Sequence, residues 1–181
     1  PEFASALKTM CHAEEEAQHK GRVAGIEAAR DAFYKGEIAE RIVRFISDNP
    51  VEDASGIAHS GLLSYEDFAE WHATVEDPVT YNYRGLDVHK CPTWTQGPVF
   101  LQHLAILDGF DLKKLGHNSA EYLHTWVESV KLAFADREAY YGDPLFDDVP
   151  MDVLLSEEYN SARRELIGAT GSLEMRPGDV G

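Results

Sequence analysis

The chain has 181 residues, enough for one ordinary domain with a sizeable core. Its 44% hydrophobic and 27% charged residues are typical of a globular protein and exclude a disordered one. A net charge of −16 argues against a nucleic-acid or anionic-membrane partner, because those surfaces attract basic patches.

The first 49 residues predict three helices. Residues 3–20 are rich in Ala and Glu, which favours a surface helix. Helical spacing continues over 22–34, and after Gly36 it resumes until Asn49-Pro50 ends it. The apolar positions that we expect to face the core are Val23, Ile26, Ala29 and Phe33, followed by Ile38, Ile42, Phe45 and Ile46.

The next segment predicts a loop and a short helix. Residues 52–63 show no strong period and contain two glycines, which indicates a loop. Ser64 then caps a short helix, with Asp67 three residues later partly reproducing a capping box.

A change of period predicts a β-hairpin. Polar and apolar residues alternate over 79–83 and 86–88, on either side of an Arg84-Gly85 turn. The segment 91–98, bracketed by two prolines, is predicted to be a loop. Pro98 suits the first turn of a mostly buried helix that Gly109 ends.

The longest predicted helix starts at Asn118-Ser-Ala-Glu121, with Asn118 as the N-cap, and stops at Gly142-Asp-Pro144. A last helix runs from Ser156 to Ile167, and the Gly-rich tail from Gly168 is predicted to be loose. The apolar residues of the long helix that we expect to face the core are Leu123, Val127, Val130 and Phe134.

Two Glu-x-x-His elements raise the question of a metal centre. Glu16 with His19 and Glu121 with His124 each place a carboxylate and an imidazole on one helix face. Helical bundles bind two iron ions with such pairs, but they also need a Glu from two further helices. Chance pairing in a chain with eight His is the simpler alternative, so we predict no metal and no cofactor.

Other catalytic signatures are weak. No Gly-x-Ser-x-Gly elbow, Gly-rich phosphate loop or reactive-thiol motif occurs. The polar stripe His117, Glu121, His124 and Glu128 is explained by a solvated face or a subunit contact. Cys11 and Cys91 allow at most one disulfide. From the residues alone, the chain contains no self-sufficient active site.

Several segments nevertheless resemble one family in order and spacing, from about Ala28 to Ile167. They are Asp31-Ala-Phe-Tyr-Lys-Gly36, Leu63-Ser-Tyr-Glu-Asp67, Tyr83-Arg-Gly85, Gly109-Phe-Asp-Leu112 and Lys131-Leu-Ala-Phe-Ala-Asp-Arg-Glu-Ala-Tyr-Tyr-Gly-Asp-Pro144. The chain is similar to the C-terminal part of the large subunit of the γ-glutamyltranspeptidase family, within the N-terminal-nucleophile hydrolases.

The resemblance implies a helix-rich α+β chain, a partial αββα fold made of helices plus one β-hairpin. Residues 1–181 would be a single segment of a larger domain that lacks the nucleophile subunit. A threonine exposed by self-cleavage, beyond this chain, would attack the γ-glutamyl amide. The chain would then contribute no catalytic residue and would be inactive alone.

The implied partners are the rest of the same precursor and a small γ-glutamyl substrate, with no nucleic acid and no membrane. The compartment stays unknown: the family implies the periplasm or the exterior, and the cytoplasm stays open. A free-standing helical binding or di-metal domain, using Glu16/His19 and Glu121/His124, is the alternative.

The chain departs from the family pattern in one loop. Where the family carries a Pro-rich Ser-Ser-Gly-Gly segment, this chain has Pro92-Thr-Trp-Thr-Gln-Gly-Pro98. A loop held by two prolines can present a bulky side chain to a pocket, although Trp94 can equally fill a core gap. We therefore predict a substrate-pocket loop formed by Trp94, Thr95, Gln96 and Gly97.

Overall fold

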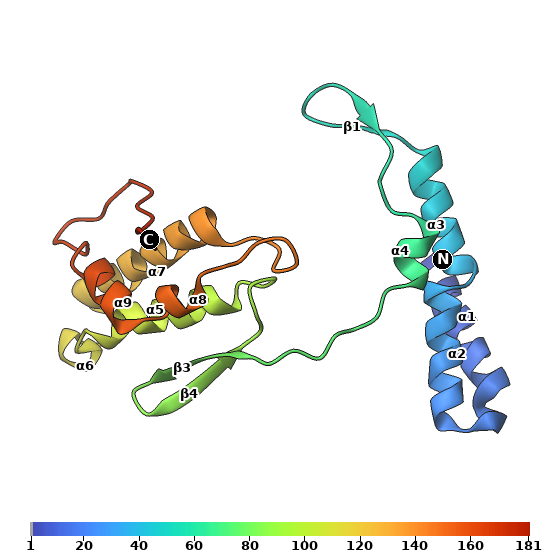
Figure 1. Ribbon diagram of the computed structural model, residues 1–181, viewed down its shortest axis with the longest axis horizontal. Helices are drawn as coiled ribbons and strands as arrows, with labels where there is room; N and C mark the ends of the chain where they lie inside the picture. The colour runs from blue at the N-terminus through green and yellow to red at the C-terminus, as the bar shows by residue number, and fades with distance from the viewer. Residues whose placement is uncertain (1) are drawn as a thin grey trace. The chain divides into compact units, whose positions relative to one another are not determined.

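A computed structural model describes residues 2–181 and divides the chain into two compact units (Figure 1). The N-terminal unit extends to Thr74, and the C-terminal unit comprises Val75–Gly181. The chain is helix-rich α+β, as predicted. Within residues 2–181, no helix combines the length and apolar character needed to cross a membrane. That the whole chain is one segment of a larger domain stays a prediction.

The N-terminal unit is built on a pair of adjacent helices, α1 (Glu2–Ala17) and α2 (Arg22–Tyr34), joined by the 3-10 turn η1 (Gln18–Lys20). Gly25 is the buried residue of α2, and a Cβ there would lie 3.2 Å from Glu14 Cγ. A small residue at this position lets the two helices approach closely.

The remaining elements of this unit follow in chain order. They are α3 (Glu37–Asp48), the two-residue strands β1 (Val51–Glu52) and β2 (Ala58–His59), and α4 (Tyr65–Ala69). The Ser64–Asp67 capping box is present, with Ser64 N donating to Asp67 Oδ2 at 2.7 Å. The β1–β2 ladder corrects the prediction of a plain loop, because a pairing of only two residues on each strand leaves no period in the sequence.

Several apolar residues predicted to face a core in this unit are exposed. Val23, Ile26 and Phe45 are at least half exposed, whereas Ile38 is buried. Helical spacing alone identifies an apolar face, but it does not show what covers that face.

The C-terminal unit begins with the predicted hairpin, β3 (Val79–Tyr83) paired antiparallel with β4 (Leu86–Lys90). Arg84 and Gly85 both have positive φ, 53° and 86°, which matches a two-residue primed turn. Arg84 Nε also donates to Asp108 Oδ1 at 3.2 Å, so the turn is tied to the end of the next helix.

Helix α5 (Gly97–Asp108) is buried on almost every side and packs against α7 (Ala120–Tyr140) and α9 (Glu157–Arg164). Short helices α6 (Leu112–Leu115) and α8 (Met151–Leu154) complete the unit (Figure 1). The core cluster comprises Val99, Ile106, Leu132 and Ala133, with Tyr141 and Ile167 packed against it.

The start and the buried face of α7 both differ from the prediction. Ser119 is the N-cap, and its hydroxyl accepts from Tyr122 N, while Asn118 has a φ of 58°. The predicted core residues Leu123, Val127 and Phe134 are exposed by 37–48%. The face that α7 buries is a second stripe at helical spacing, Thr125, Glu128, Ser129, Leu132, Ala133, Ala135 and Asp136.

The buried face of α7 predicts that two substitutions on this helix lower the stability by different amounts. Leu132→Ala should lower the free energy of unfolding by about 2–5 kcal/mol, because Leu132 is 1% exposed and leaves a cavity. Phe134→Ala should cost only about 1 kcal/mol, although it removes more atoms, because Phe134 is 37% exposed. Chemical denaturation of the two variants measures both costs. A larger loss for Phe134→Ala would restore the original assignment of the face.

Candidate functional site

A hollow of about 600 Å³ lies between the loop before α5 and the C-terminal end of α7. Three of the four predicted loop residues, Trp94, Thr95 and Gln96, line it. Gly97 does not line it, because it is buried in the first turn of α5. The other lining residues are Thr93, Arg137, Tyr141, Gly142 and Asp143.

Hydrogen bonds within the loop fix its shape. Thr95 Oγ1 donates to Pro92 O and accepts from Gly97 N, both at 3.0 Å. A Cβ at position 97 would lie 2.6 Å from Cys91 O, so the loop can close only around a glycine. These contacts fix the backbone of the loop that precedes α5.

Trp94 is neither a core filler nor a free side chain. Trp94 as a residue is 59% exposed, while its indole Nε1–H donates to Glu76 Oε2 at 2.7 Å. The polar end of the ring is thus anchored, and its apolar surface stays exposed at the hollow.

The other wall of the hollow carries two opposite charges. Arg137 Nη1 donates to Glu138 Oε1, and its guanidinium lies 6.0 Å from the centre of the Phe134 ring. Its neighbour Asp136 pairs with Arg163 instead. Asp143 Oδ1 accepts from Leu145 N at 2.9 Å. Burial raises the pKa of the Tyr141 hydroxyl well above its ordinary value, which keeps that side chain neutral.

Behind this wall, α7 buries two carboxylates that lie two turns apart. Glu128 is 2% exposed and Asp136 is fully buried. The sequence placed Glu128 on a solvated face or in a subunit contact, but it is buried against partners within this chain. A buried carboxylate needs paired charges and hydrogen bonds, and the structure supplies both.

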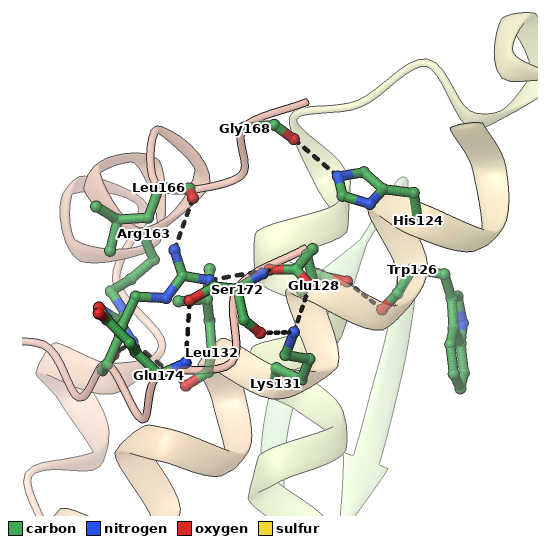
Figure 2. A network of polar contacts seen from close by, with 12 residues as sticks. His124, Trp126, Glu128, Lys131, Leu132, Arg163, Leu166, Gly168, Ser172 and Glu174 are labelled. Atoms are coloured by element: carbon green, nitrogen blue, oxygen red, sulfur yellow. Dashed lines mark hydrogen bonds and ion pairs between the residues drawn. The ribbon is translucent and has the colours of Figure 1, made fainter. Parts of the chain in front are cut away.

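Glu128 binds the C-terminal tail to α7 (Figure 2). Its Oε1 accepts from Lys131 Nζ at 2.5 Å, and its Oε2 accepts from Arg176 Nη2 at 3.0 Å and Ser172 N at 3.3 Å. Farther up the helix, His124 Nε2 donates to Gly168 O at 2.7 Å.

Asp136 joins three elements at one point. Its Oδ2 accepts from Gln102 Nε2 of α5 at 2.6 Å. Its Oδ1 accepts from Gly178 N of the tail at 2.7 Å and pairs with Arg163 of α9 at 3.1 Å. Arg163 also donates to Arg176 O. Because the Arg176 side chain binds Glu128, Arg176 connects the contacts around Glu128 with those around Asp136.

The tail is therefore not loose, contrary to the prediction. We call residues 168–178 the C-terminal strap. Its sequence contains three glycines and a proline, and its few apolar residues follow no helical or strand period, so it carries no signal of regular structure. The contacts that order it come from charged residues far away in the chain, which a local pattern cannot reveal.

The pKa values follow from these contacts. Burial alone would raise the pKa of the Glu128 carboxyl. Hydrogen bonds from Lys131 and Ser172, with the charges of Lys131 and Arg176, outweigh burial and lower it below 4.5. Burial lowers the pKa of His103 on α5 to about 4, so this imidazole is neutral at pH 7.

The two Glu-x-x-His pairs belong to different units of the chain. Glu16 and His19 belong to the N-terminal unit, and His19 Nδ1 bonds to Glu16 O at 2.8 Å. Glu121 and His124 belong to the C-terminal unit, where His124 donates a hydrogen bond to Gly168 O of the strap. Among residues 2–181, no three His, Cys, Asp or Glu side chains are grouped to hold a metal ion.

Comparison with known proteins gives a consistent picture. The family model described as gamma-glutamyltranspeptidase matches residues 3–179. The chain is 36% identical over 158 residues to the glutathione hydrolase proenzyme of Escherichia coli (strain K12), an alignment that covers 85% of this chain. The alignment spans only 26% of that relative, about a quarter of its length.

Solved structures are similar over most of the chain. The structure of LmbA2991HD matches with a TM-score of 0.79 and 45% identity, covering 95% of this chain and 30% of that one. The cephalosporin acylase from Bacillus halodurans matches with a TM-score of 0.71 and 30% identity, covering 91% and 28%.

The junction at Asp136 predicts an unequal response to two substitutions on α7. Asp136→Ala should cost about 3–5 kcal/mol of unfolding free energy, because Arg163 would stay buried without its counter-charge. The control Glu138→Ala breaks the exposed pair with Arg137 and should cost less than about 1 kcal/mol. Equal costs in urea denaturation would contradict the role given to Asp136.

The lowered pKa of Glu128 predicts a pH dependence. A carboxyl whose folded-state pKa lies below its unfolded value of 4.5 stabilises the fold above that pH. This stabilisation is lost as the pH falls through the folded-state pKa. The stability difference between the parent chain and Glu128→Gln should therefore shrink from pH 6 to pH 3. Denaturation curves across this range measure the difference, and a constant value would refute the prediction.

Proposed function

Because the chain belongs to the γ-glutamyltranspeptidase family, we propose that it is part of the large subunit of an enzyme that transfers or hydrolyses γ-glutamyl or related acyl amides. The family match over residues 3–179 is the observation that carries this proposal. The similarity to a cephalosporin acylase is the reason for including other acyl amides.

Within that enzyme the chain supplies scaffold. Its helices and hairpin are a part of the N-terminal-nucleophile hydrolase fold. The nucleophile of the complete protein is a threonine exposed by self-cleavage, and its α-amine acts as the base. The partner of residues 1–181 is the remainder of the same precursor, in keeping with a relative that is itself named a proenzyme.

Exposed apolar side chains support this role. Phe3, Phe45 and Leu62 are exposed by 78%, 67% and 98%, and the apolar stripe of α7 is exposed as well. Isolated soluble domains rarely leave so many large apolar side chains uncovered. The rest of the precursor would cover them in the complete enzyme.

The hollow at Trp94 supplies one wall of a substrate pocket. Hydrogen bonds fix the backbone of its loop, and the side chains there differ from the small residues that the family usually carries. Because a bulky Trp94 and an amide, Gln96, replace them, the complete enzyme should accept a different range of acyl groups or acceptors.

The proposal predicts where activity resides. Residues 1–181 alone should not hydrolyse γ-glutamyl-4-nitroanilide, whereas the complete precursor should do so after it splits at a threonine. Release of nitroaniline measures turnover, and the mass of each chain shows the split. Turnover by purified residues 1–181 would contradict the assignment of the nucleophile to another part of the protein.

A further inference from the structure

The hollow carries recognition groups that a scaffold does not need. Trp94 holds an anchored, half-exposed indole at the hollow, and Arg137 and Asp143 place a cation and an anion on the opposite wall. A packing role would bury Trp94 rather than leave the residue 59% exposed.

Among these groups, Arg137 gives the clearest indication of what the hollow binds. Its side chain is only one-third exposed, and one of its terminal nitrogens donates to Glu138. Among residues 2–181, the other N–H groups of its guanidinium donate to no residue. A planar guanidinium with free donors fits a carboxylate, which can accept two parallel hydrogen bonds.

Asp143 and Trp94 narrow the choice of ligand. The Asp143 carboxylate, in a chain with a net charge of −16, disfavours a ligand with several negative charges such as a phosphate. A purely apolar acyl chain would desolvate Arg137 and Asp143 without compensation. The exposed indole surface favours a flat group that can stack on it.

We propose that this hollow binds the part of the substrate that carries one carboxylate beside a planar, unsaturated or aromatic group. Arg137 binds the carboxylate, and Trp94 stacks on the plane. This assignment rests on the proposed acyl transfer, since the reaction takes place at the threonine of the complete enzyme. The carboxylate that Arg137 binds is not the α-carboxylate of the glutamyl group. The glutamyl carboxylate lies at the other end of the substrate and is bound elsewhere in the complete enzyme.

A matched pair of substrates tests the assignment in the complete, processed enzyme. They are γ-glutamyl-4-nitroanilide and γ-glutamyl-3-carboxy-4-nitroanilide, which differ by one carboxylate on the ring. Arg137→Gln should lower kcat/KM for the carboxylated anilide by about tenfold and change the other by less than about twofold. Arg22→Gln, an exposed arginine of the N-terminal unit, should change neither. An equal fall for both substrates in Arg137→Gln would overturn the assignment.

A binding measurement separates failure of the site from failure of the reaction. Calorimetry with the complete protein should show 4-aminobenzoate binding at least about fivefold more tightly than neutral 4-aminobenzamide. This comparison needs no variant, so it decides the case even if Arg137→Gln does not fold. Equal affinities would overturn the site. A preference for the benzoate without any γ-glutamyl turnover would support the site and refute the proposed reaction.

Discussion

The buried carboxylate of Asp136 is the constraint on which the C-terminal unit depends. An ionised carboxylate away from water is tolerated only when cations and hydrogen-bond donors surround it. Here the donors come from α5, α9 and the C-terminal strap, each of which is far from Asp136 in sequence. Satisfying this one group therefore sets the positions of three elements around α7.

The candidate site follows from that junction. One wall of the hollow begins at Arg137, the residue after Asp136, and continues through Tyr141, which packs on the core cluster. The other wall is the loop that leads into α5, the helix that Gln102 ties to Asp136. The spacing between indole and guanidinium is thus a consequence of core packing, which is how a scaffold preorganises a pocket.

Much of the fold could be predicted from the sequence because its signals are local. The hairpin turn at Arg84-Gly85, the Ser64 cap and the breaks at Gly36 and Gly109 each depend on a few neighbouring residues. The buried face of α7 could not be predicted in this way. It carries two acidic residues, whose burial depends on partners such as Arg163 and Arg176 that no periodicity can identify.

By itself, then, the sequence determined the helix-rich α+β class, the family and the unusual loop around Trp94, since these depend on residue order and short spacings. Only the tertiary structure decided that Glu128 is buried, that the strap is ordered, and that Arg137 and Asp143 share a hollow with Trp94. The physical reason is that burial, charge pairing and pocket geometry are properties of groups brought together across the chain, and their energies depend on the partners they meet.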